Sequence, residues 1–270
     1  MGEAPRYLAD IAALDNDKLS PFDRWEALRR LHNVDRDALI AANLLPALNN
    51  LFESDQDLLR HAALELASAK GAHGGAGGPE ASEQASRVTR GLMKVLEAPK
   101  DRMDAHSRVL ALDGIGVCST RDDFLCIETV VAATKHEDPE IRKAAARCLG
   151  SLRGGGDDVG RSAPRIARKL QPLLQDFDSS VREQVVRSLT SVSTWRDEAA
   201  VIAIAMVATK DTSTAVRRAA EECLVELFDE GSMFEADSQR QLDSLRTALS
   251  EINVVLDSGL QEVLGLTRVS

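Results

Sequence analysis

The residues best suited to metal chemistry in this chain are its histidines and the carboxylates beside them. His136-Glu137 places an imidazole next to a carboxylate, a combination that binds iron or zinc when it is repeated on facing helices. The other four histidines have no adjacent glutamate: His32, His61, His73 and His106. Because one pair supplies too few ligands for such a site, we expect a solvated turn histidine, and we predict no metal, no cofactor and no catalytic residue.

The four cysteines do not have the spacing of a metal site or a redox pair. None belongs to a C-x-x-C motif: they are Cys118, Cys126, Cys148 and Cys223. Isolated cysteines of this kind are usually small core residues, and unpaired thiols are typical of a reducing compartment. We therefore predict buried cysteines in an intracellular, cytoplasmic protein.

The composition opposes binding to nucleic acid. Aromatic residues make up 3% of the 270 residues, which leaves few platforms for stacked bases, and Trp25 and Trp195 fit core or edge positions. A formal net charge of −10 opposes attraction to phosphate backbones. No apolar run approaches the length of a membrane span, and the N-terminus lacks the apolar core of a signal peptide.

The chain repeats a short phrase: an acidic or small residue, two residues, an apolar residue, Arg, two residues, and Ala or Val. The clear copies are residues 138–145, 178–185 and 213–220. Weaker copies bring the arginines of the phrase to positions 24, 60, 108, 142, 182 and 217, in steps of 36, 48, 34, 40 and 35 residues. Self-similarity at this period indicates a stacked-repeat architecture.

Each copy of the phrase has the features of a helix start. The opening Asp or Ser suits an N-cap, and Pro139 fits the first helical position. An arginine in the first turn is disfavoured by the helix dipole, so it needs another role. We predict that each one reaches the acid or the carbonyls of a neighbouring turn and builds a ladder between repeats. The predicted ladder residues are Asp104, Arg108, Asp138, Arg142, Asp178, Arg182 and Arg217.

The segment from Asp138 to Gly150 resembles the second helix of a HEAT repeat, and the two later copies agree with it. The resemblance covers roughly residues 20–230 and is strongest in the last three units. It implies an all-α fold: a right-handed α-solenoid of about six HEAT-like, armadillo-like helical hairpins with a C-terminal capping helix.

We predict three parts of the chain: an N-terminal cap over residues 1–19, a repeat array over 20–233, and C-terminal capping helices over 234–270. A glycine-rich insert at residues 71–80 interrupts the array, since glycine at that density cannot hold a helix. From Leu242 to Leu256 the apolar residues step by 3, 4, 3 and 4, a heptad seam. This seam either caps the last repeat or forms a dimerising or partner-binding coiled coil.

Two charged surfaces are expected. Second helices line the concave side of a HEAT array, so the resemblance implies a basic stripe there. Its predicted partner-binding residues are Lys143, Arg147, Arg187 and Arg218. The turns between paired helices carry an acidic ridge, which either caps helices or binds a partner. The ridge residues are Glu53, Asp55, Asp57, Asp101, Asp104, Glu137, Asp138, Asp176, Asp178 and Asp211.

These features predict a non-enzymatic protein-binding scaffold or assembly subunit whose concave face meets an acidic segment of a protein partner. One alternative is a HEAT-like enzyme such as a bilin lyase, although no constellation of residues demands it. Another is a tubulin-binding domain of the TOG type, which resembles this chain in size and in Trp25. That residue is predicted inside a second helix, however, and the later turns are acidic where tubulin requires cations.

Overall fold

The computed structural model describes residues 5–70, 78–119, 123–152, 163–194, 196–229 and 247. Within these ranges the regular elements are thirteen α-helices and one 3₁₀ helix. The chain divides into two compact units, residues 1–152 (unit 1) and residues 153–270 (unit 2). None of the described helices combines the length and the apolarity needed to cross a membrane.

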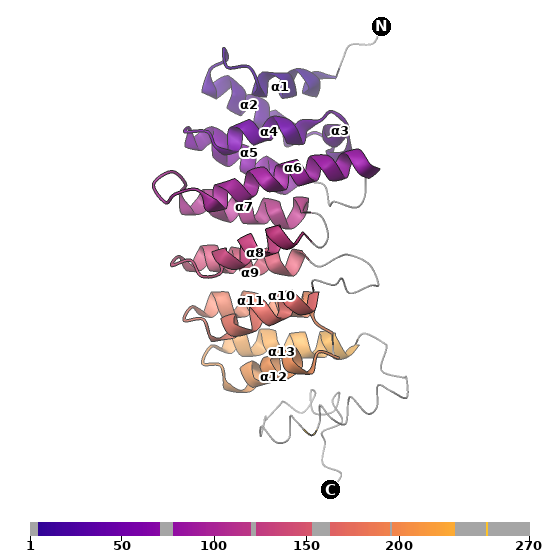
Figure 1. Cartoon of the computed structure of the whole chain (residues 1–270), viewed down its shortest axis with the longest axis vertical. Helices are drawn as coiled ribbons and strands as arrows, with labels where there is room; N and C mark the ends of the chain where they lie inside the picture. Colours follow the sequence, from indigo (N-terminus) through magenta and orange to yellow (C-terminus); the bar gives the residue numbers. More distant parts are fainter. Residues whose placement is uncertain are drawn as a thin grey trace. The chain divides into compact units, whose positions relative to one another are not determined.

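Unit 1 contains four helical hairpins that stack in two layers (Figure 1). The first helices of the hairpins are α1 (Arg6–Leu14), α4 (Leu44–Phe52), α6 (Gly78–Glu97) and α8 (Phe124–Ala133). The second helices are α2 (Pro21–Leu31), α5 (Asp57–Lys70), α7 (Ala105–Cys118) and α9 (Pro139–Ser151). Each first helix packs against the next first helix, and each second helix against the next second helix. A short helix, α3 (Arg36–Ala41), packs against α4.

The described part of unit 2 contains two further hairpins. In the first of them, α10 (Ala163–Leu170) and the 3₁₀ helix η1 (Gln171–Gln175) pack against α11 (Ser179–Val192). In the second, α12 (Glu198–Lys210) packs against α13 (Thr214–Asp229), and α13 also packs against α11. With the four hairpins of unit 1, this confirms the predicted all-α repeat fold with about six hairpins.

The predicted helix starts are confirmed at the clear copies of the phrase. Asp138 accepts a hydrogen bond from the backbone N–H of Glu140 at 2.8 Å, and Asp178 accepts one from that of Ser180 at 2.7 Å. Asp104 caps α7 in the same way, because its carboxylate accepts a hydrogen bond from the backbone N–H of Ser107 at 2.7 Å. These bonds satisfy N–H groups that have no partner inside the helix, which fixes where each second helix begins.

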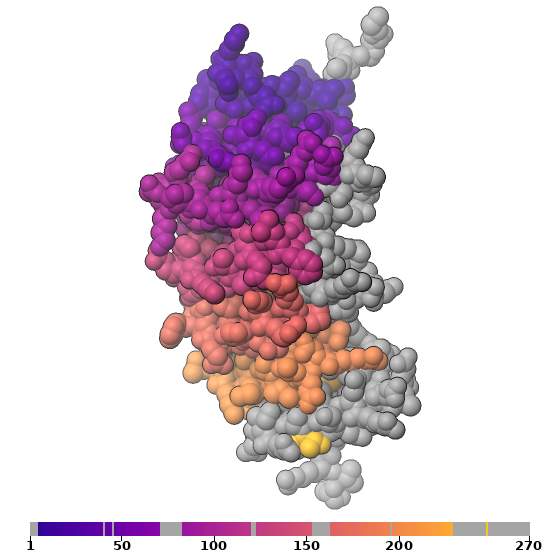
Figure 2. Space-filling model, viewed as in Figure 1, coloured from indigo at the N-terminus to yellow at the C-terminus, as the bar shows by residue number. Residues whose placement is uncertain are grey.

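The core lies between the two layers and is made of small and branched aliphatic side chains. On α9 the predicted apolar face is buried, from Ile141 and Ala145 to Cys148 and Leu149. Their spacing of four, three and one residues keeps them on one side of the helix. Each hairpin of unit 1 packs against the next one along the chain. In Figure 2, where colour follows residue number, these hairpins therefore form successive bands from indigo to magenta.

Several sequence predictions fall outside the described residues. Residues 71–77 of the glycine-rich insert lie there, and α6 begins at Gly78. Trp195 lies there too, as do residues 234–246 and 248–270 of the expected capping helices, with nearly all of the heptad seam. Trp25 is described and lies inside the second helix α2, as expected.

Candidate functional site

The repeated arginines turn back toward the end of the preceding helix. The Nη1 of Arg142 donates to the carbonyl oxygens of His136 and Glu137, at 3.0 and 2.8 Å. The Nη1 of Arg217 donates in the same way to those of Asp211 and Thr212, at 2.8 and 3.4 Å. These carbonyl groups belong to the turn between the two helices of a hairpin, and backbone carbonyl groups need hydrogen-bond donors. The arginine in the first turn of the second helix therefore holds the turn that precedes it.

Two of these arginines also link successive hairpins. Arg60 on α5 is buried, and its guanidinium donates to Ser107 Oγ on α7 at 2.9 Å and to Asp104 Oδ2 at 2.9 Å. Arg182 on α11 makes a bidentate pair with Asp211 at the end of α12, with N–O distances of 2.7 and 2.8 Å. The hydrogen bond from Arg182 lowers the pKa of Asp211, so this carboxylate stays ionised to a lower pH than an ordinary aspartate.

The predicted ladder therefore contains two kinds of contact. Asp104 and Arg182 join successive hairpins, and so does Arg60, a repeated arginine that was not among the named ladder residues. Arg108 donates to the carbonyl oxygens of Leu96 and Ala98, which lie in its own hairpin. A stabilising role of the ladder as a whole remains a prediction.

The four residues predicted to bind a partner all have acidic neighbours. In unit 1, the Nζ of Lys143 lies 3.7 Å from Glu140 Oε2. Arg147 Nη2 on α9 donates a hydrogen bond to Asp113 Oδ1 on α7 at 2.6 Å. In unit 2, Arg187 pairs with Glu183 and Arg218 with Glu222, each at 3.0 Å and one helical turn apart. Lys143 and Arg147 lie one turn apart on α9, and Arg187 and Arg218 lie on α11 and α13, two helices that pack against each other.

The acidic ridge contains carboxylates that already carry out local tasks. Asp104, Asp138 and Asp178 cap helices, and Asp211 pairs with Arg182. Glu137, another ridge residue, forms an ion pair with Lys100, with 2.8 Å between Glu137 Oε1 and Lys100 Nζ. Capping and local pairing thus account for these members without a partner.

The histidine and cysteine side chains have structural surroundings. His136 Nδ1 accepts a hydrogen bond from the backbone N–H of Asp138 at 3.0 Å, which fixes the ring against the turn. Among the described residues, no group of three His, Cys, Asp or Glu side chains is placed to hold a metal ion. The four cysteines are buried, as predicted, and burial raises the pKa of the Cys118 thiol to about 12.

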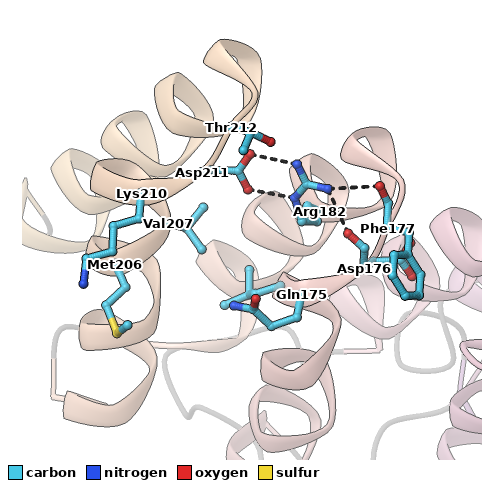
Figure 3. A pocket seen from close by; sticks show the side chains of 10 residues that line it. Gln175, Asp176, Phe177, Arg182, Met206, Val207, Lys210, Asp211 and Thr212 are labelled. Carbon is cyan, nitrogen blue, oxygen red and sulfur yellow. Dashed lines mark hydrogen bonds and ion pairs between the residues drawn. The ribbon is translucent and has the colours of Figure 1, made fainter.

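A groove at the turn edge of unit 2 was not predicted from the sequence (Figure 3). It has a volume of about 480 Å³ and lies between the turn 175–177 and the last two turns of α12. Phe177 and Met206 line it from opposite sides, and both are exposed. A signal was present in the sequence, because Phe177 occupies a turn position that holds Glu137 and Thr212 in other hairpins.

A second groove lies on the first-helix layer of unit 1. It has a volume of about 640 Å³ between α4 and α6, and α6 contributes the cations Arg87, Arg90 and Lys94. Arg87 Nη2 lies 2.7 Å from Glu83 Oε1, and Lys94 Nζ lies 3.4 Å from Glu53 Oε1, so both cations have an acidic neighbour. The groove in unit 1 is therefore lined mainly by cations. The groove in unit 2 is lined by an aromatic side chain that an aspartate precedes and another follows in the sequence.

Comparison with known proteins supports the repeat fold. Residues 139–192 match the family model described as a HEAT-like repeat. This segment contains α9 and α11, two of the helices that carry the repeated arginine. No curated protein matches the full sequence significantly.

Solved structures extend the likeness over most of the chain. Two engineered proteins, at 18% and 20% sequence identity, align with TM-scores of 0.58 and 0.59. Each alignment covers 83% of this chain, and 97% and 99% of the engineered chains respectively. A designed armadillo repeat protein in complex with the peptide (KR)4 aligns with a TM-score of 0.51 at 16% identity, over 90% of this chain and 99% of that one. With its stacked hairpins and its HEAT-like segment, the chain is a HEAT/armadillo-like α-solenoid.

Proposed function

We propose that the protein is a non-enzymatic protein-binding scaffold or assembly subunit, and that Lys143, Arg147, Arg187 and Arg218 meet an acidic segment of a protein partner. The observation that carries this proposal is the accessibility of cations on the second helices of both units. The side chains of Arg187 and Arg218 are 56% and 79% exposed although each has a glutamate beside it.

The pairing of these cations does not prevent binding. Exposed ion pairs one helical turn apart contribute only about 0.3–0.5 kcal/mol, so an incoming carboxylate can replace Glu183 or Glu222 at little cost. Arg147 is different, because Asp113 lies on the neighbouring helix and holds the guanidinium through both Nε and Nη2. It therefore presents an oriented cation at the junction of α7 and α9.

The likeness to helical-repeat proteins also supports a binding role. One structurally similar chain, the designed armadillo repeat protein, was solved with the peptide (KR)4 bound. Folds of this kind serve many functions, so the partner has to be argued from surface chemistry. A cytoplasmic location belongs to the same proposal and is supported by four buried, unpaired cysteines.

The proposal is tested by charge reversal on the second helices. We expect the R147E/R187E variant to lose a partner that the wild-type chain retains in affinity capture from native lysate, as measured by mass spectrometry. The matched control is R87E/R90E, which changes the net charge equally but lies on the first helix α6. Circular dichroism of both variants checks that helix content is preserved.

Each outcome of this experiment is decisive for the basic stripe. Loss of a partner in R147E/R187E alone supports binding through the second helices. Survival of every partner in that variant refutes this role for the stripe. Equal loss in both variants shows that net charge matters rather than the stripe.

A further inference from the structure

We propose that the turn-edge groove of unit 2 binds a basic segment of a protein partner, with an arginine or lysine side chain stacked on the ring of Phe177. This is a second surface, separate from the basic stripe, and it takes a partner segment of the opposite charge. The two proposals therefore stand or fall independently.

Phe177 is the most exposed large apolar side chain among the described residues, with a relative accessibility of 104%. Across the groove Met206 is 38% exposed, and the floor contains the buried side chains of Leu174 and Val207. Exposed aromatic and methionine side chains around a cavity are the composition of an interaction site rather than of an ordinary surface.

The groove is held in shape by one arginine (Figure 3). Arg182 Nη1 donates to the carbonyl oxygens of Asp176 and Phe177, at 2.8 and 3.3 Å, while its other nitrogens hold Asp211. The same guanidinium thus anchors the turn that carries Phe177 and the end of α12 that carries Lys210. A preformed site of this kind loses little conformational entropy when a partner binds.

The charges around Phe177 favour a cation. The ring lies in the sequence Asp176-Phe177-Asp178, so carboxylates precede and follow it. The groove lining itself is neutral, with Asp176 and Asp211 against Arg182 and Lys210. Outside it, Asp178 adds a carboxylate beside Phe177, and Arg217 adds a cation at the far side, where it donates to the carbonyl oxygens of Asp211 and Thr212. The charge of Arg182 is offset by its bidentate pair with Asp211. The positive side chain of Lys210 lies on the α12 side, away from Phe177.

These features select arginine or lysine as the occupant. A guanidinium or ammonium group is attracted to the face of an aromatic ring within about 6 Å of its centre. Its aliphatic stem can lie along Met206 and Val207 while its charged head remains near Asp176 and Asp178. Arginine suits the site better, because its planar group stacks on a ring and can bond a carboxylate with two N–H groups.

The experiment uses the full-length chain and a capped peptide with one arginine between leucines, acetyl-Gly-Leu-Arg-Leu-Gly-amide. Binding is followed by ¹⁹F NMR of the chain labelled with 4-fluorophenylalanine and by titration calorimetry. Two further peptides replace the arginine with citrulline, which is neutral and nearly isosteric, or with glutamate. The variant is Phe177→Ala, and the matched control is Phe22→Ala, which removes another exposed phenylalanine on α2 of unit 1.

We expect saturable binding of the arginine peptide, a loss of at least about fivefold in affinity in Phe177→Ala, and no change in Phe22→Ala. The citrulline and glutamate peptides should bind more weakly than the arginine peptide. Equal affinity of wild type and Phe177→Ala, equal binding of the glutamate peptide, or no saturable binding of the arginine peptide would overturn the proposal. Phe177→Ala keeps every charge, so its effect reports the ring and not the net charge of the protein.

Discussion

Two turns of the molecule share a sequence signature and differ in structure. In unit 1 the turn before α7 ends in Met103-Asp104, and in unit 2 the turn before α11 ends in Phe177-Asp178. Each aspartate is an N-cap, and each apolar residue lies five positions before a repeat arginine. Yet Met103 is 4% exposed and Phe177 is 104% exposed.

The difference follows from the length of the two turns. The turn before α7 is long enough to fold back, and the N–H groups of Arg102 and Met103 both donate to the carbonyl oxygen of Pro99. This returns Met103 to the core. Between η1 and Asp178 the chain has only two residues, and the N–H of Asp176 bonds to the carbonyl oxygen of Leu173. The exposure of Phe177 is therefore a property of its own turn and not of the repeat position.

The arginines beside the two turns do not differ in this way, because the side chains of Arg60 and Arg182 are only 4% and 11% exposed. Arg60 and Ser107 are buried, and they bond the partly exposed Asp104 in a network that also includes His61, whose Nε2 lies 3.1 Å from Asp104 Oδ2. Burial opposes the ionisation of Asp104, but hydrogen bonds from Ser107, Arg60 and His61 outweigh it and lower the pKa. Each turn is therefore held by a largely buried arginine, and the turn before α11 also leaves an aromatic side chain exposed.

The largest effect should come from removing the buried guanidinium of Arg60 on α5, which bonds Asp104 in the turn before α7. We expect Arg60→Met to lower the free energy of unfolding by about 3 to 4 kcal/mol. The stem still packs, but the four hydrogen bonds of the buried guanidinium, each worth about 1 kcal/mol, are lost. Their acceptors are Ser54, Asp57, Asp104 and Ser107. Urea unfolding followed by circular dichroism measures this change. Arg90→Met is the matched control, since the described hydrogen bond of Arg90 is to Ser86 in its own helix. A similar loss in both variants would remove the distinction between junction and surface.

The next effect compares the two apolar residues directly. We expect Met103→Ala to cost about 2 to 3 kcal/mol, since it removes a buried side chain and leaves a cavity. Phe177→Ala should change stability by less than about 0.5 kcal/mol, because its ring has no buried area to lose. The same urea titration compares the two variants. A large loss in Phe177→Ala would show that the ring packs in solution, and the groove would then be closed to a partner.

The repeat architecture was predictable from residues whose environment is the same in every hairpin. Asp138, Arg142 and Ala145 define a cap, a first-turn cation and a core position, and these depend on spacing along one helix. The repeated arginine in the first turn had no local explanation. Its reason, the carbonyl groups of the turn between the two helices, becomes visible only when both helices of the hairpin are in place.

The surface features were less predictable because they depend on distances across helices. The sequence showed Arg147 as a cation but not that Asp113, on a different helix, orients it. It showed Phe177 between two acids but not the opposing Met206, which lies almost thirty positions further along the chain. Side chains that line a groove from two helices have no fixed spacing in sequence, so periodicity cannot identify them.

The smallest effect concerns pH and a third turn, the one before α9, where the position of Met103 and Phe177 is held by Glu137. Its neighbour His136 accepts a hydrogen bond at Nδ1 from the N–H of Asp138, so the ring is bound in its neutral form. Burial, together with the charges of Arg108 and Lys100, lowers the pKa of His136, and Glu137 and Asp138 only partly oppose this.

Because the pKa of His136 is lower in the folded than in the unfolded chain, the unfolded state binds more protons below about pH 6.5. Stability contributed by the neutral ring should therefore be complete above that pH and decline as the pH falls through the folded pKa. Urea midpoints between pH 7.5 and 5 measure the decline, and His136→Gln, which keeps an acceptor but cannot titrate in this range, should reduce it. A midpoint that falls equally in wild type and His136→Gln would assign the decline to other groups. The turn before α9 would then act as a structural junction whose stability does not depend on the protonation of His136.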